Sequence, residues 1–149
     1  MRHSGLVMLA AVCAGGCGGD TGPGATATVT AVIDGTAWTA TQAVQVSVAG
    51  TSLIVGGTSS AQIQLLITIP NITTTGTYAL GVGLAGTGVV NVGTQSWTTN
   101  VVGGEGSVIV TAFDATRVAG TFAFDAAPHL GTGSTGIKSV TSGTFDLTY

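Results

Sequence analysis

The chain has 149 residues, a length that suits one domain, and only 6% of them are charged, against about 25% in ordinary soluble domains. Its only lysine and arginine residues are Arg2, Arg117 and Lys138, and its formal net charge is −3. Binding to nucleic acid or to anionic lipid headgroups needs clustered lysine and arginine, so this composition excludes both as electrostatic partners.

The chain begins with a predicted signal peptide at residues 1–16. A short, positively charged start precedes a compact apolar run from Leu6 to Val12, which is too short to span a bilayer. Small residues then lead directly into Cys17, and this arrangement resembles the cleavage signal of bacterial lipoproteins, with Ala14 where the favoured pattern has leucine. The resemblance implies that Cys17 becomes the first mature residue and carries the acyl chains.

The pair Cys13 and Cys17 also permits two other interpretations, a metal clip and a disulfide. A zinc clip needs further cysteine or histidine ligands nearby. Cleavage before Cys17 removes Cys13 with the signal, and the one cysteine that is left cannot form an intrachain disulfide. We therefore predict lipidation at Cys17, no metal site and no cofactor.

Residues 17–25 are predicted to be the lipidated cysteine and a flexible tether, because glycine and proline dominate this stretch. Several acyl chains on one cysteine give stable anchoring, so the predicted partner is a membrane. In lipoproteins, Gly18 rather than aspartate after the cysteine implies transfer to the outer membrane, if the source is Gram-negative. The expected location is therefore the cell envelope.

Residues 26–149 are predicted to form one all-β domain. Apolar and polar residues alternate with period two, the pattern of strands with one buried face. Asp34-Gly35 is a strong hairpin signal, and glycine-rich breaks separate the later strands. The turn spacing predicts an antiparallel β-sandwich or small β-barrel of about ten short strands. The clearest alternating sets are Val44, Val46 and Val48; Ile63, Leu65, Ile67 and Ile69; Phe122 and Phe124; and Phe145, Leu147 and Tyr149.

Exposed edge strands are usually protected by lysine, and Lys138 is the only lysine of the chain. The edges must therefore be closed, bulged at glycine or covered by a partner. This predicts weak self-association or a protein partner in the envelope.

Two loops match the glycine pattern G-x-G-x-x-G, at residues 81–86 and 131–136. A dinucleotide site of this kind needs a helix directly after the loop. Residues 87–92 and 137–140 have the composition of strands instead, so we expect no nucleotide site.

His129 is the only histidine after the predicted signal peptide. Nucleophilic catalysis needs a base beside a hydroxyl, and Ser134 with Asp125 would complete a triad, but no G-x-S-x-G elbow is present. Two of the aspartates, among Asp34, Asp114, Asp125 and Asp146, could also meet as the carboxylate pair of a glycosidase. We predict that the protein is not an enzyme, with a hydrolase using His129 or paired aspartates as one alternative.

Trp97 is the candidate ligand-binding residue, because its position between Ser96 and Thr98 suggests exposure. Tyr78 alternates with Leu80 and is expected to point inward. Trp97 and Trp38 could provide a surface on which sugars stack, so a carbohydrate-binding domain is a second alternative. Packing in the core is the default interpretation for both tryptophans.

Short motifs recur along the domain: VIDGTAW from Val32, GTYAL from Gly76, GSVIVTAFD from Gly106, GTFAF from Gly120 and GTFD from Gly143. With them, residues 29–149 resemble small bacterial lipoprotein domains of unknown function. The resemblance implies an all-β envelope lipoprotein and supplies no catalytic residues. The final strand also resembles that of a small outer-membrane β-barrel, a third alternative, but the chain has too few aromatic residues for two girdles.

The predicted function is therefore that of a lipid-anchored cell-envelope domain without enzymatic activity, serving as a binding or structural module. Its predicted partners are the membrane, through Cys17, and an envelope protein or a glycan.

Overall fold

The computed structural model describes residues 26–148. The predicted signal peptide, the tether with Cys17, and Tyr149 lie outside the described residues. Among residues 26–148, no helix has the length and apolar character needed to cross a membrane.

Eleven strands make up the domain, and most of them are joined by short turns. They are β1 (Thr26–Ile33), β2 (Thr36–Thr39), β3 (Gln42–Ala49), β4 (Ser52–Thr58), β5 (Ile63–Ile69), β6 (Gly76–Gly81), β7 (Thr87–Val92), β8 (Gln95–Thr98), β9 (Glu105–Phe113), β10 (Arg117–Pro128) and β11 (Lys138–Thr148). The predicted hairpin at Asp34-Gly35 is confirmed, since it joins β1 to β2, and both residues have the positive φ that such a turn requires.

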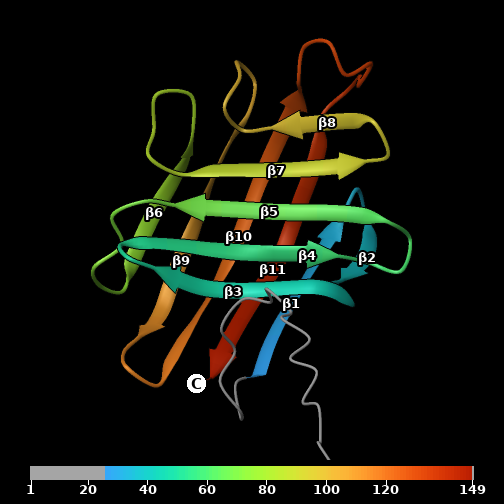
Figure 1. The fold of residues 1–149 in the computed structure, drawn as a ribbon. Coiled ribbons are helices and arrows are strands. Elements are labelled where there is room, and N and C mark those ends of the chain that lie inside the picture. Colours follow the sequence, from blue (N-terminus) through green and yellow to red (C-terminus); the bar gives the residue numbers. More distant parts are fainter. Residues whose placement is uncertain (1–25, 149) are drawn as a thin grey trace, which may run out of the picture.

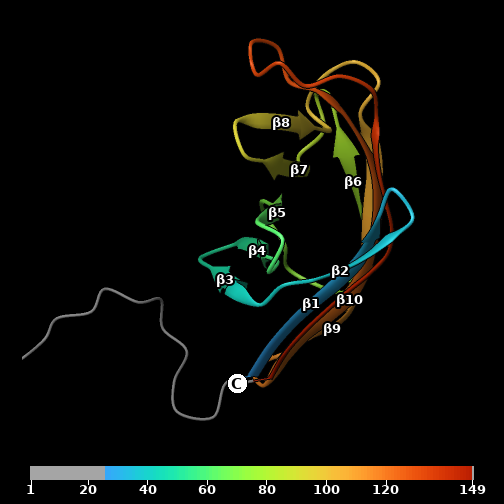
Figure 2. The same cartoon turned by 90° about the vertical axis from the view of Figure 1, so that its right-hand side faces the viewer.

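The strands form two layers of one curled antiparallel sheet (Figure 1). The first layer has the order β2-β1-β11-β10-β9-β6, and the second has the order β8-β7-β5-β4-β3. Figure 1 shows the second layer crossing in front of the first, and Figure 2 shows the two layers facing each other. The prediction of an antiparallel all-β fold with about ten strands is confirmed.

Strand β10 connects the two layers. Most of its length pairs with β9 and β11 in the first layer. Its last residues, Ala127 and Pro128, pair instead with Thr98 and Trp97 of β8. The sheet therefore continues from one layer into the other.

The core fills the space between the layers. Alternate residues of β5 point into it, and Leu65, Ile67 and Ile69 are fully buried. Phe122 and Phe124 enter it from β10, as the alternation predicted, and the Phe122 ring stacks on Phe145 with centroids 6.5 Å apart. Each such buried side chain contributes about 1.5–3 kcal/mol through removal of apolar surface from water.

Candidate functional site

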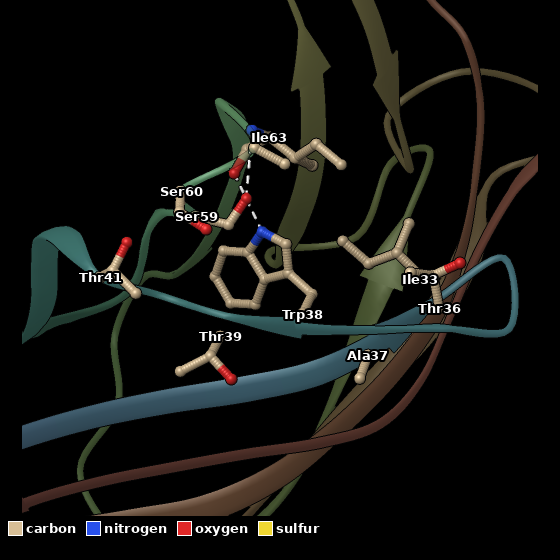
Figure 3. A pocket seen from close by; sticks show the side chains of 10 residues that line it. Ile33, Thr36, Ala37, Trp38, Thr39, Thr41, Ser59, Ser60 and Ile63 are labelled. Atoms are coloured by element: carbon tan, nitrogen blue, oxygen red, sulfur yellow. Dashed lines mark hydrogen bonds between the residues drawn. The ribbon is translucent and has the colours of Figure 1, made fainter.

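A pocket opens beside β2, at an edge of the first layer (Figure 3). It has a volume of about 300 Å³ and lies between β2 and the turn that joins β4 to β5. Its lining residues are Ile33, Thr36, Ala37, Trp38, Thr39, Thr41, Ser59, Ser60, Ala61 and Ile63.

Trp38 connects the two layers at this pocket. Its indole is buried, and the indole nitrogen Nε1 donates a hydrogen bond to the carbonyl oxygen of Ile63 at 2.9 Å. Trp38 belongs to β2 in the first layer, whereas Ile63 begins β5 in the second. The contact therefore fixes the distance between the two sides of the pocket.

The turn after β4 is held by Ser59, which is buried. The Ser59 amide donates to the Ile63 carbonyl at 3.0 Å, and the Ile63 amide donates to the Ser59 hydroxyl at 3.3 Å. Gln62 has a φ of 58°, the left-handed conformation that closes the turn. These contacts hold Ser60 and Ala61 at the rim of the pocket.

The polar side chains of the pocket are neutral at physiological pH: the hydroxyls of three threonines and two serines, and the indole N–H of Trp38. Hydroxyls donate and accept hydrogen bonds but do not act as bases without a neighbouring titratable group. This chemistry suits an uncharged polar ligand. Among the lining residues, the sequence suggested a ligand-binding role only for Trp38, as one of the two tryptophans that could stack on a sugar.

Of the three residues of the alternative catalytic triad, only Ser134 and His129 lie together. The Ser134 hydroxyl donates to the carbonyl oxygen of Ser96 at 2.7 Å, and the His129 amide donates to the same oxygen at 2.9 Å. Asp125 is exposed on β10, four positions before His129. Four residues of extended chain span about 13 Å, so the geometry gives Ser134 and His129 a shared loop but no triad with Asp125.

Asp34 stabilises the turn between β1 and β2. Lys138 Nζ donates to its carboxylate at 2.6 Å, and the Ser139 amide donates at 2.9 Å. Partial burial acts to raise the pKa of Asp34, but these two hydrogen bonds outweigh it and hold the pKa below its ordinary value of 3.8.

Asp114 and Asp146 are also held by local hydrogen bonds. The Thr116 hydroxyl and amide each donate to Asp114 at 2.7 Å, and this lowers the pKa of Asp114. Arg117 Nε donates to Asp146 at 2.9 Å, and this contact lowers the pKa of Asp146. Asp114 thus stabilises the turn between β9 and β10, and Asp146 connects the end of β11 to the start of β10.

One pair of carboxylates was not expected from the sequence. Glu105 of β9 lies directly opposite Asp125 of β10 in the strand register. Only the pairing of β9 with β10 brings the two together, and alternation alone does not show which strands pair. Among residues 26–148, no three histidine, cysteine, aspartate or glutamate side chains are grouped closely enough to hold a metal ion.

The expected exposure of Trp97 is wrong. Its side chain is only 4% exposed, because β8 pairs with the end of β10 and residues 129–137 fold over the ring. Nε1 donates to the carbonyl oxygens of Thr135 and Gly136 at 3.2 and 3.1 Å. Lys138 Nζ lies 5.1 Å from the ring centroid. The ring therefore presents no open face on which a sugar could stack.

Comparison with curated proteins and with solved structures gives no match. A family model does match, and it spans residues 25–147, which include nearly all of the strands described above. The chain therefore belongs to the family described as Domain of unknown function (DUF6252).

Proposed function

We propose that the protein is a lipid-anchored cell-envelope protein whose all-β domain is a binding or structural module rather than an enzyme. The observation that carries the proposal is the sequence at the N-terminus: an apolar run, then Ala14-Gly15-Gly16, then Cys17. The first strand begins at Thr26, so residues 18–25 would join the anchor to the domain. If the source is Gram-negative, Gly18 favours the outer membrane.

The arrangement of the domain supports the non-catalytic part of the proposal. Asp34, Asp114 and Asp146 form hydrogen bonds that stabilise turns and strand ends. The pocket beside β2 offers hydroxyls for a neutral ligand and no charged side chain. A module of this kind would hold a partner, an envelope protein or a glycan, close to the membrane.

Phase separation in a nonionic detergent tests the anchor. The full chain, expressed in a bacterium with lipoprotein processing, should enter the detergent phase, whereas Cys17→Ser should move the protein to the aqueous phase. Cys13→Ser is the matched control, because Cys13 is four residues away and is predicted to leave with the signal peptide. A full chain that stays in the aqueous phase, or detergent partition that Cys17→Ser does not reduce at all, would overturn the proposal.

The non-catalytic part has its own test. His129→Ala, Asp125→Ala and Asp114→Ala remove the side chains on which a hydrolase would depend. If a hydrolytic activity is found in the purified protein and each replacement abolishes it, the module is an enzyme after all. Binding of a partner that survives all three replacements supports the proposal.

We also propose weak self-association through a sheet edge. Among the described strands, β3 hydrogen-bonds only with β4, and so its other edge ends the second layer. β3 carries no lysine or proline, although a bulge between Gln42 and Gln45 interrupts the start of the strand.

A further inference from the structure

Three loops gather at one end of the domain, at the top of Figures 1 and 2. They are residues 82–86 between β6 and β7, 99–104 between β8 and β9, and 129–137 between β10 and β11. We call these three loops the loop end. The loop 99–104 adjoins the strand ends that lead into the other two: a Cβ on Gly81, the last residue of β6, would lie 3.6 Å from the Gly104 carbonyl oxygen, and a Cβ on Gly103 would lie 3.7 Å from the Cβ of Ala127 near the end of β10.

The loop end concentrates exposed aliphatic side chains. Val102 is 92% exposed and Leu130 is 89% exposed. Of the large hydrophobic residues exposed among residues 26–148, only Ile109, on β9, lies elsewhere. The members of the loop end are Val82, Leu84, Val102, Leu130 and Ile137. Clustered exposure of this kind indicates an interaction site rather than the scattered apolar residues of an ordinary surface.

Hydrogen bonds fix these loops in their exposed conformations. The Thr132 hydroxyl donates to the His129 carbonyl oxygen at 2.8 Å, across Leu130. The Gly104 amide donates to the Val101 carbonyl oxygen at 2.9 Å, across Val102. The two most exposed side chains therefore stand on closed turns and are held out from the domain.

The chemistry of the loop end selects its partner. None of the three loops contains aspartate, glutamate, lysine or arginine. The five exposed aliphatic side chains are spread over the three loops, two each on 82–86 and 129–137 and one on 99–104, among mostly small or uncharged polar residues. Exposed aliphatic side chains of this kind suit the hydrocarbon region of a lipid bilayer, where each side chain can be buried independently of the others. Without cations, the loops have no attraction for anionic headgroups.

We propose that the loop end inserts Val102, Leu130 and the neighbouring aliphatic side chains into the surface of an electroneutral lipid bilayer. This insertion does not depend on Cys17, since the two would act at opposite ends of the domain. Thr26 lies across from Thr148 at the far end of β11, whereas β11 begins directly after the 129–137 loop.

The lengths of the domain and of residues 18–25 determine whether the loop end can reach the membrane in which Cys17 would be anchored. β11 has 11 residues, which corresponds to about 36 Å of strand. Residues 18–25 can span at most about 29 Å when fully extended. A domain anchored at Cys17 and standing upright therefore directs the loop end away from the anchoring membrane, toward a second lipid surface.

Vesicle binding tests the proposal with residues 18–149. This chain keeps all eleven strands and the whole core described above, and thermal unfolding verifies that each variant is folded. The probe is a phosphatidylcholine vesicle, and binding is measured by flotation at low and high salt. The unsubstituted domain should float with the vesicles equally at both salt concentrations. V102S/L130S should lower the partition coefficient at least tenfold, because one inserted aliphatic side chain accounts for about a factor of ten.

Ile109→Ser is the matched control, since Ile109 is the exposed aliphatic residue away from the loop end, at 45% exposure. It should leave vesicle binding unchanged. Failure of the unsubstituted domain to bind, binding that requires anionic lipid, or an equal loss with Ile109→Ser would each overturn the proposal. The proposal would also be overturned if the unsubstituted domain formed dimers without binding vesicles and V102S/L130S dissociated those dimers. The loops would then bind a second copy of the chain. Lipidation of Cys17 is untouched by any of these results.

Discussion

Phe122 of β10 lies directly across from Gly143 of β11, and Gly120 lies directly across from Phe145 in the same ladder. The two G-T-F motifs of the sequence therefore pair with each other in antiparallel register. Each glycine leaves room for the ring of the other motif: a Cβ on Gly143 would lie 2.3 Å from the Phe122 ring. A glycine opposite a phenylalanine is thus a packing requirement of this core.

We expect Gly143→Ala to destabilise the domain by about 1–3 kcal/mol, the usual effect of overfilling a packed core. The Phe122 ring cannot move freely, because it stacks between Phe124 and Phe145 at 6.4 and 6.5 Å. Urea unfolding of residues 18–149 measures the change. Thr121→Ala, which alters the outward face of the same ladder, should cost less than about 1 kcal/mol. Equal stability of Gly143→Ala and the unsubstituted domain would refute the packing role.

Trp97→Ala is expected to destabilise the domain by about 3–5 kcal/mol, since it removes a large buried ring. The effect would show as a lower midpoint of thermal unfolding. Trp97→Phe keeps most of the apolar volume and loses the two hydrogen bonds to Thr135 and Gly136, so its effect should be smaller. A Trp97→Ala domain that unfolds at the original temperature would contradict the burial of this residue.

The contrast between Trp97 and the strands shows what the sequence could predict. Alternation identified β5 through Ile63 to Ile69, and Asp34-Gly35 identified the first hairpin, because both signals are local. The burial of Trp97 depends on β8 meeting the end of β10 and on residues 129–137 closing over the ring. Nothing in the alternation of Ser96, Trp97 and Thr98 specifies those distant partners.

The same reasoning applies to the sites. The hydroxyl pocket forms where β2 meets the turn after β4, and the loop end forms from three loops that are separate in the sequence. The composition of residues 87–92 and 137–140 correctly predicted strands after the loops at 81–86 and 131–136. It could not indicate that both loops lie at one end of the domain, because that depends on strand order.

The pH dependence of stability should follow the aspartates. The pKa values of Asp34 and Asp146 are lowered in the folded domain from an ordinary value of 3.8. A carboxylate with a lowered pKa stabilises the fold above its unfolded pKa, and this contribution disappears as the pH falls through the folded pKa. Stability should therefore be level above about pH 5 and decline below pH 4.

Asp34→Asn tests this assignment. It removes the ion pair with Lys138, so the variant should be slightly less stable at neutral pH and should lose less stability in acid. Unfolding in urea at several pH values measures both effects. An unchanged acid profile would show that the hydrogen bonds of Asp34 do not contribute to the pH dependence.

Self-association through β3 predicts a concentration-dependent sedimentation coefficient for residues 18–149. Ser47→Lys places a charge in the exposed edge strand and should reduce association. Thr121→Lys, in the middle of the first layer, should leave it unchanged. A domain that stays monomeric at high concentration would argue strongly against this contact.

Mass spectrometry of the mature N-terminus is the most direct test of lipid anchoring. For the full chain isolated from a bacterium that processes lipoproteins, anchoring predicts an N-terminal peptide that begins at Cys17 and carries acyl chains. The Cys17→Ala chain should carry no acyl mass, and Cys13→Ala should be processed like the unsubstituted chain. An unmodified Cys17 within a longer N-terminal peptide, or a mature chain that begins after Cys17, would contradict the proposed anchor.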